Sequence, residues 1–160
     1  MLELDRVQQG KWPGIEVCSM AATILVAEDN EKNRQLIRDI LLYHGFQVFE
    51  AENGAVAIEK AIRQRPDLIL MDIQMPVMDG MTAARLIRTD PSLQGIPVIA
   101  LTSFAMTGDR ERLLEAGFDD YIAKPIDTRQ LPEIVKRNLG NGIHEGNGIR
   151  PLSTGGTETC

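Results

Sequence analysis

The chain has few of the features that mark secreted, membrane-spanning or nucleic-acid-binding proteins. Only two of its 160 residues are cysteines, Cys18 and Cys160, and we expect both thiols to be reduced and inert. Residues 1–22 lack the long apolar stretch of a secretory signal, and no apolar run is long enough to span a bilayer. The formal net charge of -6 argues against a nucleic-acid-binding surface, which is normally basic. These absences favour a cytoplasmic protein that binds neither membrane nor nucleic acid.

A glycine-rich phosphate-binding loop is also missing. Residues 24–27 form a short apolar run typical of a buried strand, but no Gly-x-Gly-x-x-Gly motif follows it. Glu28 and Asp29 stand there instead, and their negative charge would repel a pyrophosphate. The sequence therefore argues against a dinucleotide-binding domain.

What the sequence does contain is a regular alternation of strand-like and helix-like segments. Its hydrophobic content of 43% and charged content of 25% are ordinary for a globular domain. Strand-like patterns lie at residues 24–27, 46–49, 67–72, 96–101 and 121–123. Helical patterns lie at residues 31–44, 54–62, 83–87, 109–116 and 130–139. This alternation predicts an α/β fold, a doubly wound five-stranded parallel sheet with five helices on its two faces.

A few residues indicate where the helices begin and which side chains they bury. Asn30 can cap the helix that follows it. Pro132 fits only the first turn of a helix, so the last helix should begin near Gln130. In the preceding helix, Leu113 and Leu114 are expected to point inward.

The two ends of the chain differ in composition from its middle. Residues 1–22 mix charge, Gly and Pro without a helical or strand period, and we expect a flexible N-terminal extension. Residues 140–160 are rich in Gly, Asn and Thr, and we expect a flexible C-terminal tail. One domain, residues 23–139, would then carry all the chemistry. So short a tail leaves no room for an output module, so output is expected to run through a partner protein.

Polar residues that could take part in catalysis or metal binding end, or directly follow, four of the predicted strands. Glu28 and Asp29 follow the first strand, and Asp72 ends the third. Thr102 follows the fourth strand and Lys124 the fifth. Each alone has an ordinary interpretation, as a loop acid, a strand-end residue or a solvated charge. In a parallel sheet, however, all of them share the carboxyl edge, where α/β proteins bind ligands.

Such a set of side chains suits phosphoryl chemistry with a divalent metal. Carboxylate oxygens are ligands for Mg²⁺, which pairs naturally with phosphate oxygens. A carboxylate can also act as a nucleophile and form an aspartyl-phosphate, while a lysine and a threonine hydroxyl stabilise the phosphoryl group. After Asp72, Pro76 and Gly80 are expected to turn the chain sharply, because Pro fixes φ and Gly permits a positive φ.

Four separated segments closely resemble the receiver domain of bacterial two-component response regulators, in the CheY-like superfamily. They are VAEDN, LMDIQMPVMDG, LTS and YIAKP, at residues 26–30, 70–80, 101–103 and 121–125. The resemblance covers roughly residues 22–139 and implies a flavodoxin-like sheet with strand order 2-1-3-4-5. Residues 103–109 and the short ends are most similar to DivK-type single-domain regulators.

The resemblance implies a role for each matching position. Asp72 would accept a phosphoryl group from a sensor histidine kinase or a histidine phosphotransfer protein. Mg²⁺ would be bound by the side chains of Asp29 and Asp72, by the backbone carbonyl of Gln74, and by Glu28 through metal-bound water. Lys124 would contact the phosphoryl group. A domain of this kind catalyses only its own phosphorylation and dephosphorylation, so we expect a signalling domain rather than an enzyme.

Thr102 and Tyr121 occupy the positions of the family's coupled switch. The resemblance implies that the hydroxyl moves toward the phosphoryl oxygen while the aromatic ring turns inward. The face built from the fourth and fifth helices and the fifth strand would then change and bind a downstream target protein, and a homodimer could form through the same face. The ordinary alternative for Tyr121 is a half-buried strand aromatic. The resemblance also implies a cis peptide bond between Lys124 and Pro125.

Two other interpretations stay open. The chain could be a receiver fragment of a larger regulator or of a hybrid kinase. A Mg²⁺-dependent phosphatase with an aspartate nucleophile is less favoured, because haloacid-dehalogenase-like enzymes need an acid at the position of Gln74. Finally, Phe104 lies two residues after Thr102. The resemblance implies that this position lines the approach of water to the phosphoryl group, which a bulky side chain would hinder. Slow loss of the phosphoryl group is therefore expected.

Overall fold

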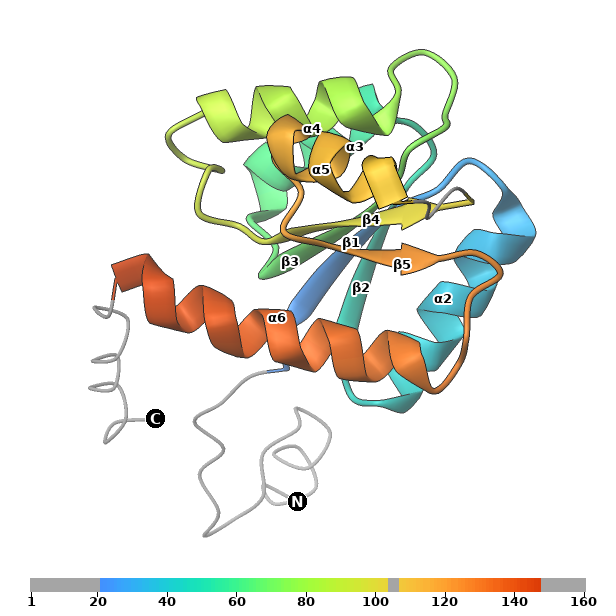
Figure 1. Cartoon of the computed structure of the whole chain (residues 1–160). Coiled ribbons are helices and arrows are strands. Elements are labelled where there is room, and N and C mark those ends of the chain that lie inside the picture. The colour runs from blue at the N-terminus through green and yellow to red at the C-terminus, as the bar shows by residue number, and fades with distance from the viewer. Residues whose placement is uncertain (1–20, 104–106, 148–160) are drawn as a thin grey trace, which may run out of the picture.

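Strands and helices alternate along the whole described part of the chain, which in this computed structural model comprises residues 21–103 and 107–147. The elements are β1 (Thr23–Ala27), α2 (Glu31–Tyr43), β2 (Gln47–Ala51), α3 (Gly54–Gln64), β3 (Leu68–Asp72), α4 (Gly80–Thr89), β4 (Val98–Thr102), α5 (Thr107–Ala116), β5 (Asp120–Ala123) and α6 (Gln130–Asn147). The strands form one parallel sheet in the order β2-β1-β3-β4-β5 (Figure 1). The predicted fold class and strand order are confirmed.

The central strands fill two separate cores, one on each face of the sheet. Side chains alternate across a strand, so Leu25 and Ile69 pack under α3, α4 and α5, while Ile24 and Leu68 pack under α2 and α6. Figure 1 shows these two groups of helices on opposite sides of the strands. Burial on both faces explains why the strands read as nearly continuous apolar runs.

Three helices, α2, α3 and α4, begin at a residue whose side chain caps the first turn. The Oδ1 atom of Asn30 accepts from the backbone N–H of Asn33 at 3.0 Å, which starts α2. Asn53 caps α3 in the same way, and Asp79 caps α4. The last helix begins at Gln130, where Pro132 falls in the first turn.

Two details differ from the sequence-based expectation. Helix α6 continues to Asn147, whereas the sequence predicted a flexible segment from Gly140; no proline follows Pro132 within the helix, so its hydrogen-bond ladder can propagate. Leu114 is 48% exposed, and only Leu113 of the pair is buried, because neighbouring helical residues point in directions about 100° apart. The remaining parts of both predicted flexible ends, residues 1–20 and 148–160, lie outside the described residues.

None of the helices in residues 21–103 and 107–147 combines the length and the apolar character needed to cross a membrane.

Candidate functional site

The carboxyl edge of the sheet brings together polar residues from four strands. β1 and β3 are paired, so Glu28, just past β1, lies beside the end of β3 at Asp72. β4 ends at Thr102, whose partner in β5 is Ala123, and Lys124 follows directly. Topology alone therefore places these side chains in one region, as the strand ends predicted.

Lys124 joins two of the acids. Its Nζ atom lies 3.0 Å from Oε1 of Glu28 and 3.0 Å from Oδ2 of Asp72. The Lys124 side chain is 17% exposed, against 1% for Glu28 and 6% for Asp72. Buried charges need partners, and here one ammonium group serves two carboxylates.

Three carboxylates form the acidic cluster of the site. Glu28, Asp29 and Asp72 each place an oxygen within 4.8 Å of the others. Despite its closeness to Lys124, Oε1 of Glu28 receives no hydrogen bond of acceptable geometry from any described residue. One lysine cannot neutralise three carboxylates, and Asp29 is exposed at the open side. The donor set, all oxygen and with a net negative charge, fits a divalent cation such as Mg²⁺.

The charges of the site influence one another. Burial raises the pKa of Asp72 to about 6, and the negative charge of Glu28 adds to this, against the opposing hydrogen bonds from Lys124 and the Gln74 backbone. Desolvation works to lower the pKa of Lys124, but its contacts with Asp72 and Glu28 outweigh it and raise that pKa. The lysine therefore stays charged, and a further cation at the cluster would favour the carboxylate form of Asp72.

Hydrogen bonds hold the turn after β3 close to Asp72. The N–H of Gln74 donates to Oδ1 of Asp72 at 3.2 Å, and the N–H of Gly80 donates to the carbonyl of Ile73 at 2.9 Å. The expected positive φ at Gly80 is wrong: the positive φ of this turn, 65°, belongs to Val77. Gly80 is needed for another reason, since a Cβ there would clash with the carbonyl oxygen of Asp72 and lie 2.9 Å from the Cα of Ile73.

Thr102 and Tyr121 lie on the same face of the sheet. Tyr121 is paired with Ala100, and Thr102 follows two residues after Ala100, so alternation places both side chains on one side. Thr102 is buried, while Tyr121 is half-buried and packs against the core under α3, α4 and α5. The geometry places the hydroxyl and the ring on the face that α5 covers. The Lys124–Pro125 peptide bond is cis, as the resemblance implied.

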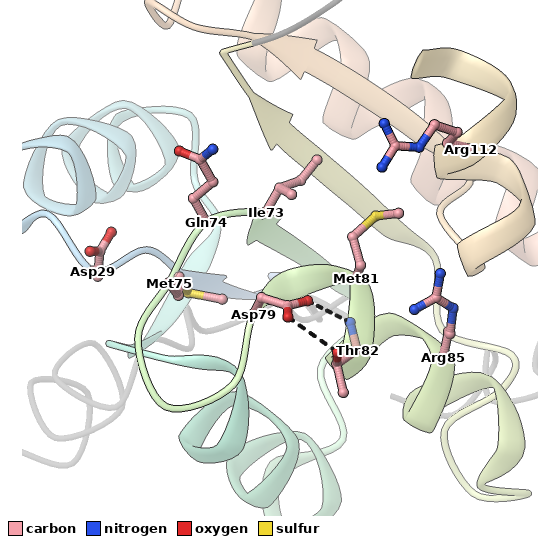
Figure 2. A pocket seen from close by; sticks show the side chains of 9 residues that line it. All are labelled: Asp29, Ile73, Gln74, Met75, Asp79, Met81, Thr82, Arg85 and Arg112. Carbon is pink, nitrogen blue, oxygen red and sulfur yellow. Dashed lines mark hydrogen bonds between the residues drawn. The ribbon is translucent and has the colours of Figure 1, made fainter. Parts of the chain in front are cut away.

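An open cavity of about 660 Å³ lies beside the acidic cluster. Figure 2 shows Asp29 and Gln74 on one side of it, and Arg85 of α4 and Arg112 of α5 on the other. Of the three clustered carboxylates, Asp29 lines this cavity.

Sequence reasoning missed the residue that holds the Glu28 backbone. Nη1 of Arg34 donates to the Glu28 carbonyl at 2.7 Å, and its Nε donates to Oε1 of Glu50 at 3.0 Å. Glu50 reaches this place through the pairing of β1 with β2, in which Val26 is opposite Glu50. The position of Arg34 just inside α2 was a usable signal, whereas no local pattern points to Glu50. Phe104, expected to hinder water, lies outside the described residues, as do Cys18 and Cys160.

The chain is similar in sequence to response regulators from Brucella. A polar-differentiation response regulator DivK of Brucella anthropi is 42% identical over 122 residues, which cover 76% of this chain and 99% of that protein. The DivK of Brucella ovis is 40% identical over the same shares of both chains.

Solved structures show the same fold at 42% and at 27% identity. The receiver domain of a sensor histidine kinase from Pseudomonas aeruginosa, determined with a magnesium ion coordinated in its active site cleft, has a TM-score of 0.70 and 42% identity, covering 75% of this chain and 98% of that one. The chemotaxis protein CheY4 of Vibrio cholerae has a TM-score of 0.70 and 27% identity, covering 74% and 98%.

The family model of the response regulator receiver domain matches residues 24–136, which is most of the chain. Receiver domains of this family work in two-component systems, where they interact with histidine kinases and downstream targets, and they bind Mg²⁺ in an acidic site. The fold, the strand-end acids and the sequence match agree, and the chain belongs to the response regulator receiver domain family.

Proposed function

We propose that this chain is a phosphorylation-controlled receiver in which Asp72 accepts a phosphoryl group from a histidine kinase or a histidine phosphotransfer protein. The observation that carries the proposal is the contact of Lys124 with both Asp72 and Glu28, each at 3.0 Å, at the carboxyl edge of the sheet. This contact supports a role for the buried Asp72 carboxylate as the nucleophile, because a fixed positive charge lies beside it. Asp29 of the same acidic cluster lines the open cavity. The receiver unit comprises residues 23–139 and acts in the cytoplasm.

The acidic cluster would hold the metal that this reaction needs. The side chains of Asp29 and Asp72, the backbone carbonyl of Gln74, and Glu28 through a water molecule would bind Mg²⁺. Bound there, the ion supplies positive charge that offsets the charge of the transferring phosphoryl oxygens. The oxygens of Glu28, Asp29 and Asp72 within 4.8 Å of one another support this assignment.

In the transfer step, a carboxylate oxygen of Asp72 attacks the phosphorus of the donor. A bond forms between that oxygen and phosphorus, and the bond from phosphorus to the donor histidine nitrogen breaks. Lys124 keeps its proton throughout, because its two carboxylate contacts raise its pKa, and its ammonium group contacts the phosphoryl oxygens. The electron pair of the broken bond stays on the donor histidine nitrogen, and a proton on the other nitrogen of that ring makes the leaving group a neutral imidazole. No proton of this chain then has to move.

The phosphorylated state would be reported through Thr102 and Tyr121. The Thr102 hydroxyl would move to a phosphoryl oxygen and Tyr121 would turn inward, which is supported by their position on one face of β4 and β5. The face formed by α5, β5 and α6 would then bind a downstream target protein, and it is also the surface proposed for a homodimer. A near-complete shift between two conformations needs a differential stabilisation of about 5 kcal/mol, and a phosphoryl group adds about -1.5 to -2 of charge.

The site fits a receiver that stands alone and one that is part of a larger protein. A single-domain regulator is supported by the DivK relative, 99% of whose length is matched. A receiver of a hybrid kinase is supported by the 42% identity to the receiver domain of a sensor histidine kinase. The phosphoryl chemistry at Asp72 is the same in both.

Intact-mass spectrometry after incubation with acetyl phosphate and Mg²⁺ tests the proposal. Wild type should gain one phosphoryl group, EDTA should prevent it, and Asp72→Asn should gain none. Asp79→Asn is the matched control, because Asp79 lines the same cavity and caps α4 but is not in the acidic cluster. An adduct that persists on Asp72→Asn, or no adduct on wild type, would contradict the proposal.

A further inference from the structure

The backbone of Glu28, the first residue after β1, is held by hydrogen bonds at both its N–H and its carbonyl. Its N–H donates to the carbonyl of Ala51, at the end of β2, at 3.0 Å. Its carbonyl accepts from Nη1 of Arg34, on α2, at 2.7 Å. The first bond fixes the peptide before Glu28 and the second fixes the peptide that leads into Asp29, so together they restrain the backbone that carries two of the three clustered carboxylates.

Arg34 is itself held in place. Its Nε donates to Oε1 of Glu50 at 3.0 Å, and the Arg34 side chain is only 17% exposed. The other oxygen of Glu50, Oε2, accepts from Nη1 of Arg38 at 3.0 Å. Two donors of one guanidinium group thus join the Glu28 carbonyl to β2, an arrangement that depends on the planar fork of arginine.

We propose that Arg34, fixed by Glu50, is a positioning residue for the metal site. Three carboxylates within 4.8 Å of one another repel, and their segment must be held while the cation enters. Arg34 holds it through the Glu28 carbonyl without touching the reacting atoms. The inference rests on the proposed function, because it assumes that Glu28, Asp29 and Asp72 serve Mg²⁺.

Electrostatics and positioning predict opposite effects of removing this arginine. A positive charge near an acidic site weakens the binding of a cation, so its removal alone would strengthen Mg²⁺ binding. Loss of positioning would weaken Mg²⁺ binding instead. Arg38 is the matched control: it binds the same Glu50 carboxylate, but its bonds within the described residues go to Glu50 and Asp39.

The experiment is a calorimetric titration of the full chain with MgCl₂. Arg34→Gln should weaken Mg²⁺ binding about 10-fold or more, which is the usual effect of losing a residue that orients a metal ligand. Arg34→Lys should also weaken it, because lysine keeps the charge but cannot span the Glu28 carbonyl and Glu50 together. Arg38→Gln should bind Mg²⁺ as tightly as wild type or more tightly. Equal or tighter binding by both Arg34 variants would overturn the inference.

Two further measurements keep the result unambiguous. Thermal unfolding in EDTA shows whether each variant is folded. If Arg34→Gln is not folded, Arg34→Lys decides in its place, with weaker Mg²⁺ binding expected. Wild type is titrated alongside. If wild type itself fails to bind Mg²⁺, both the proposed function and this inference fail. If wild type binds and the Arg34 variants bind equally well, only the inference fails.

Discussion

Replacing Gly80 with alanine should destabilise the protein and displace the carboxylate at the centre of the site. Gly80 begins α4 and passes directly against the end of β3. An added Cβ would clash with the carbonyl oxygen of Asp72, and would lie 2.9 Å from the Cα of Ile73 and 3.0 Å from the carbonyl carbon of Asp72. All three neighbours are backbone atoms, so no side chain can rotate away to make room.

The magnitude follows from two opposing effects. Overpacking a well-packed interior costs about 1–3 kcal/mol, and a clash with backbone belongs at the upper end of that range. Alanine is favoured over glycine within a helix by up to about 1 kcal/mol, which offsets part of the cost. We therefore expect Gly80→Ala to lower the unfolding free energy by about 2 kcal/mol.

Urea denaturation followed by circular dichroism measures this change, with Gly95→Ala as the matched control. Gly95 is exposed in the turn between α4 and β4, and no described atom lies within 4 Å of the position its Cβ would take. Its substitution should change the unfolding free energy by less than about 0.5 kcal/mol. Because the clash involves the Asp72 backbone, Gly80→Ala should also slow phosphorylation by acetyl phosphate, whereas Gly95→Ala should not.

The reasoning would be refuted if Gly80→Ala were as stable as Gly95→Ala and were phosphorylated at the wild-type rate. That result would mean that the turn after β3 can widen freely, and that the close approach of α4 to β3 does not hold Asp72 in place.

Three further predictions concern α6, β5 and the acidic cluster. Asn138 is buried, and its Nδ2 donates at 2.9 Å to both Oδ2 of Asp120 and the Ile134 carbonyl. Asn138→Ala should therefore lower the unfolding free energy, measured by urea denaturation, by about 1–3 kcal/mol. A change below about 0.5 kcal/mol would contradict this. Burial works to raise the pKa of Asp120, but hydrogen bonds from Asn138 and Arg137 outweigh it and hold that pKa below its usual range. The carboxylate therefore stabilises the fold above about pH 4 and loses this effect as the pH falls further. Wild type should be more stable than Asp120→Asn at neutral pH, and the stabilities of the two should converge in strong acid. A difference in stability that did not change with pH would show that ionisation of Asp120 does not stabilise the fold. Asp72→Asn removes one of three carboxylates within 4.8 Å of one another, so in EDTA the variant should stay folded and be at least as stable as wild type. A loss of unfolding free energy above about 1 kcal/mol would show that the ion pair of Asp72 with Lys124 outweighs the repulsion among the carboxylates.

Much of the site could be predicted because its residues follow strands. Glu28, Asp72 and Lys124 each come directly after or at the end of an apolar run, and parallel strands bring such positions to one edge. The contacts of Lys124 with the two acids are what that topology requires. For these residues the local sequence and the fold carry the same information.

Other features depend on contacts between segments that no local pattern relates. Glu50 reaches Arg34 only through the register of β1 with β2, and the sequence of β2 does not specify that register. The need for glycine at position 80 comes from the approach of α4 to β3 rather than from a positive φ. Leu114 shows the same limit, because a helix that lies on a sheet buries only a narrow stripe of its surface.

The measurement that tests the central claim most directly is the location of the phosphoryl group within the chain. After phosphorylation with acetyl phosphate and Mg²⁺, reduction with borohydride converts an aspartyl-phosphate to homoserine, which peptide mass spectrometry can place in the sequence. We expect homoserine at position 72 alone. Homoserine at Asp29 or Asp79, or at no position, would contradict it.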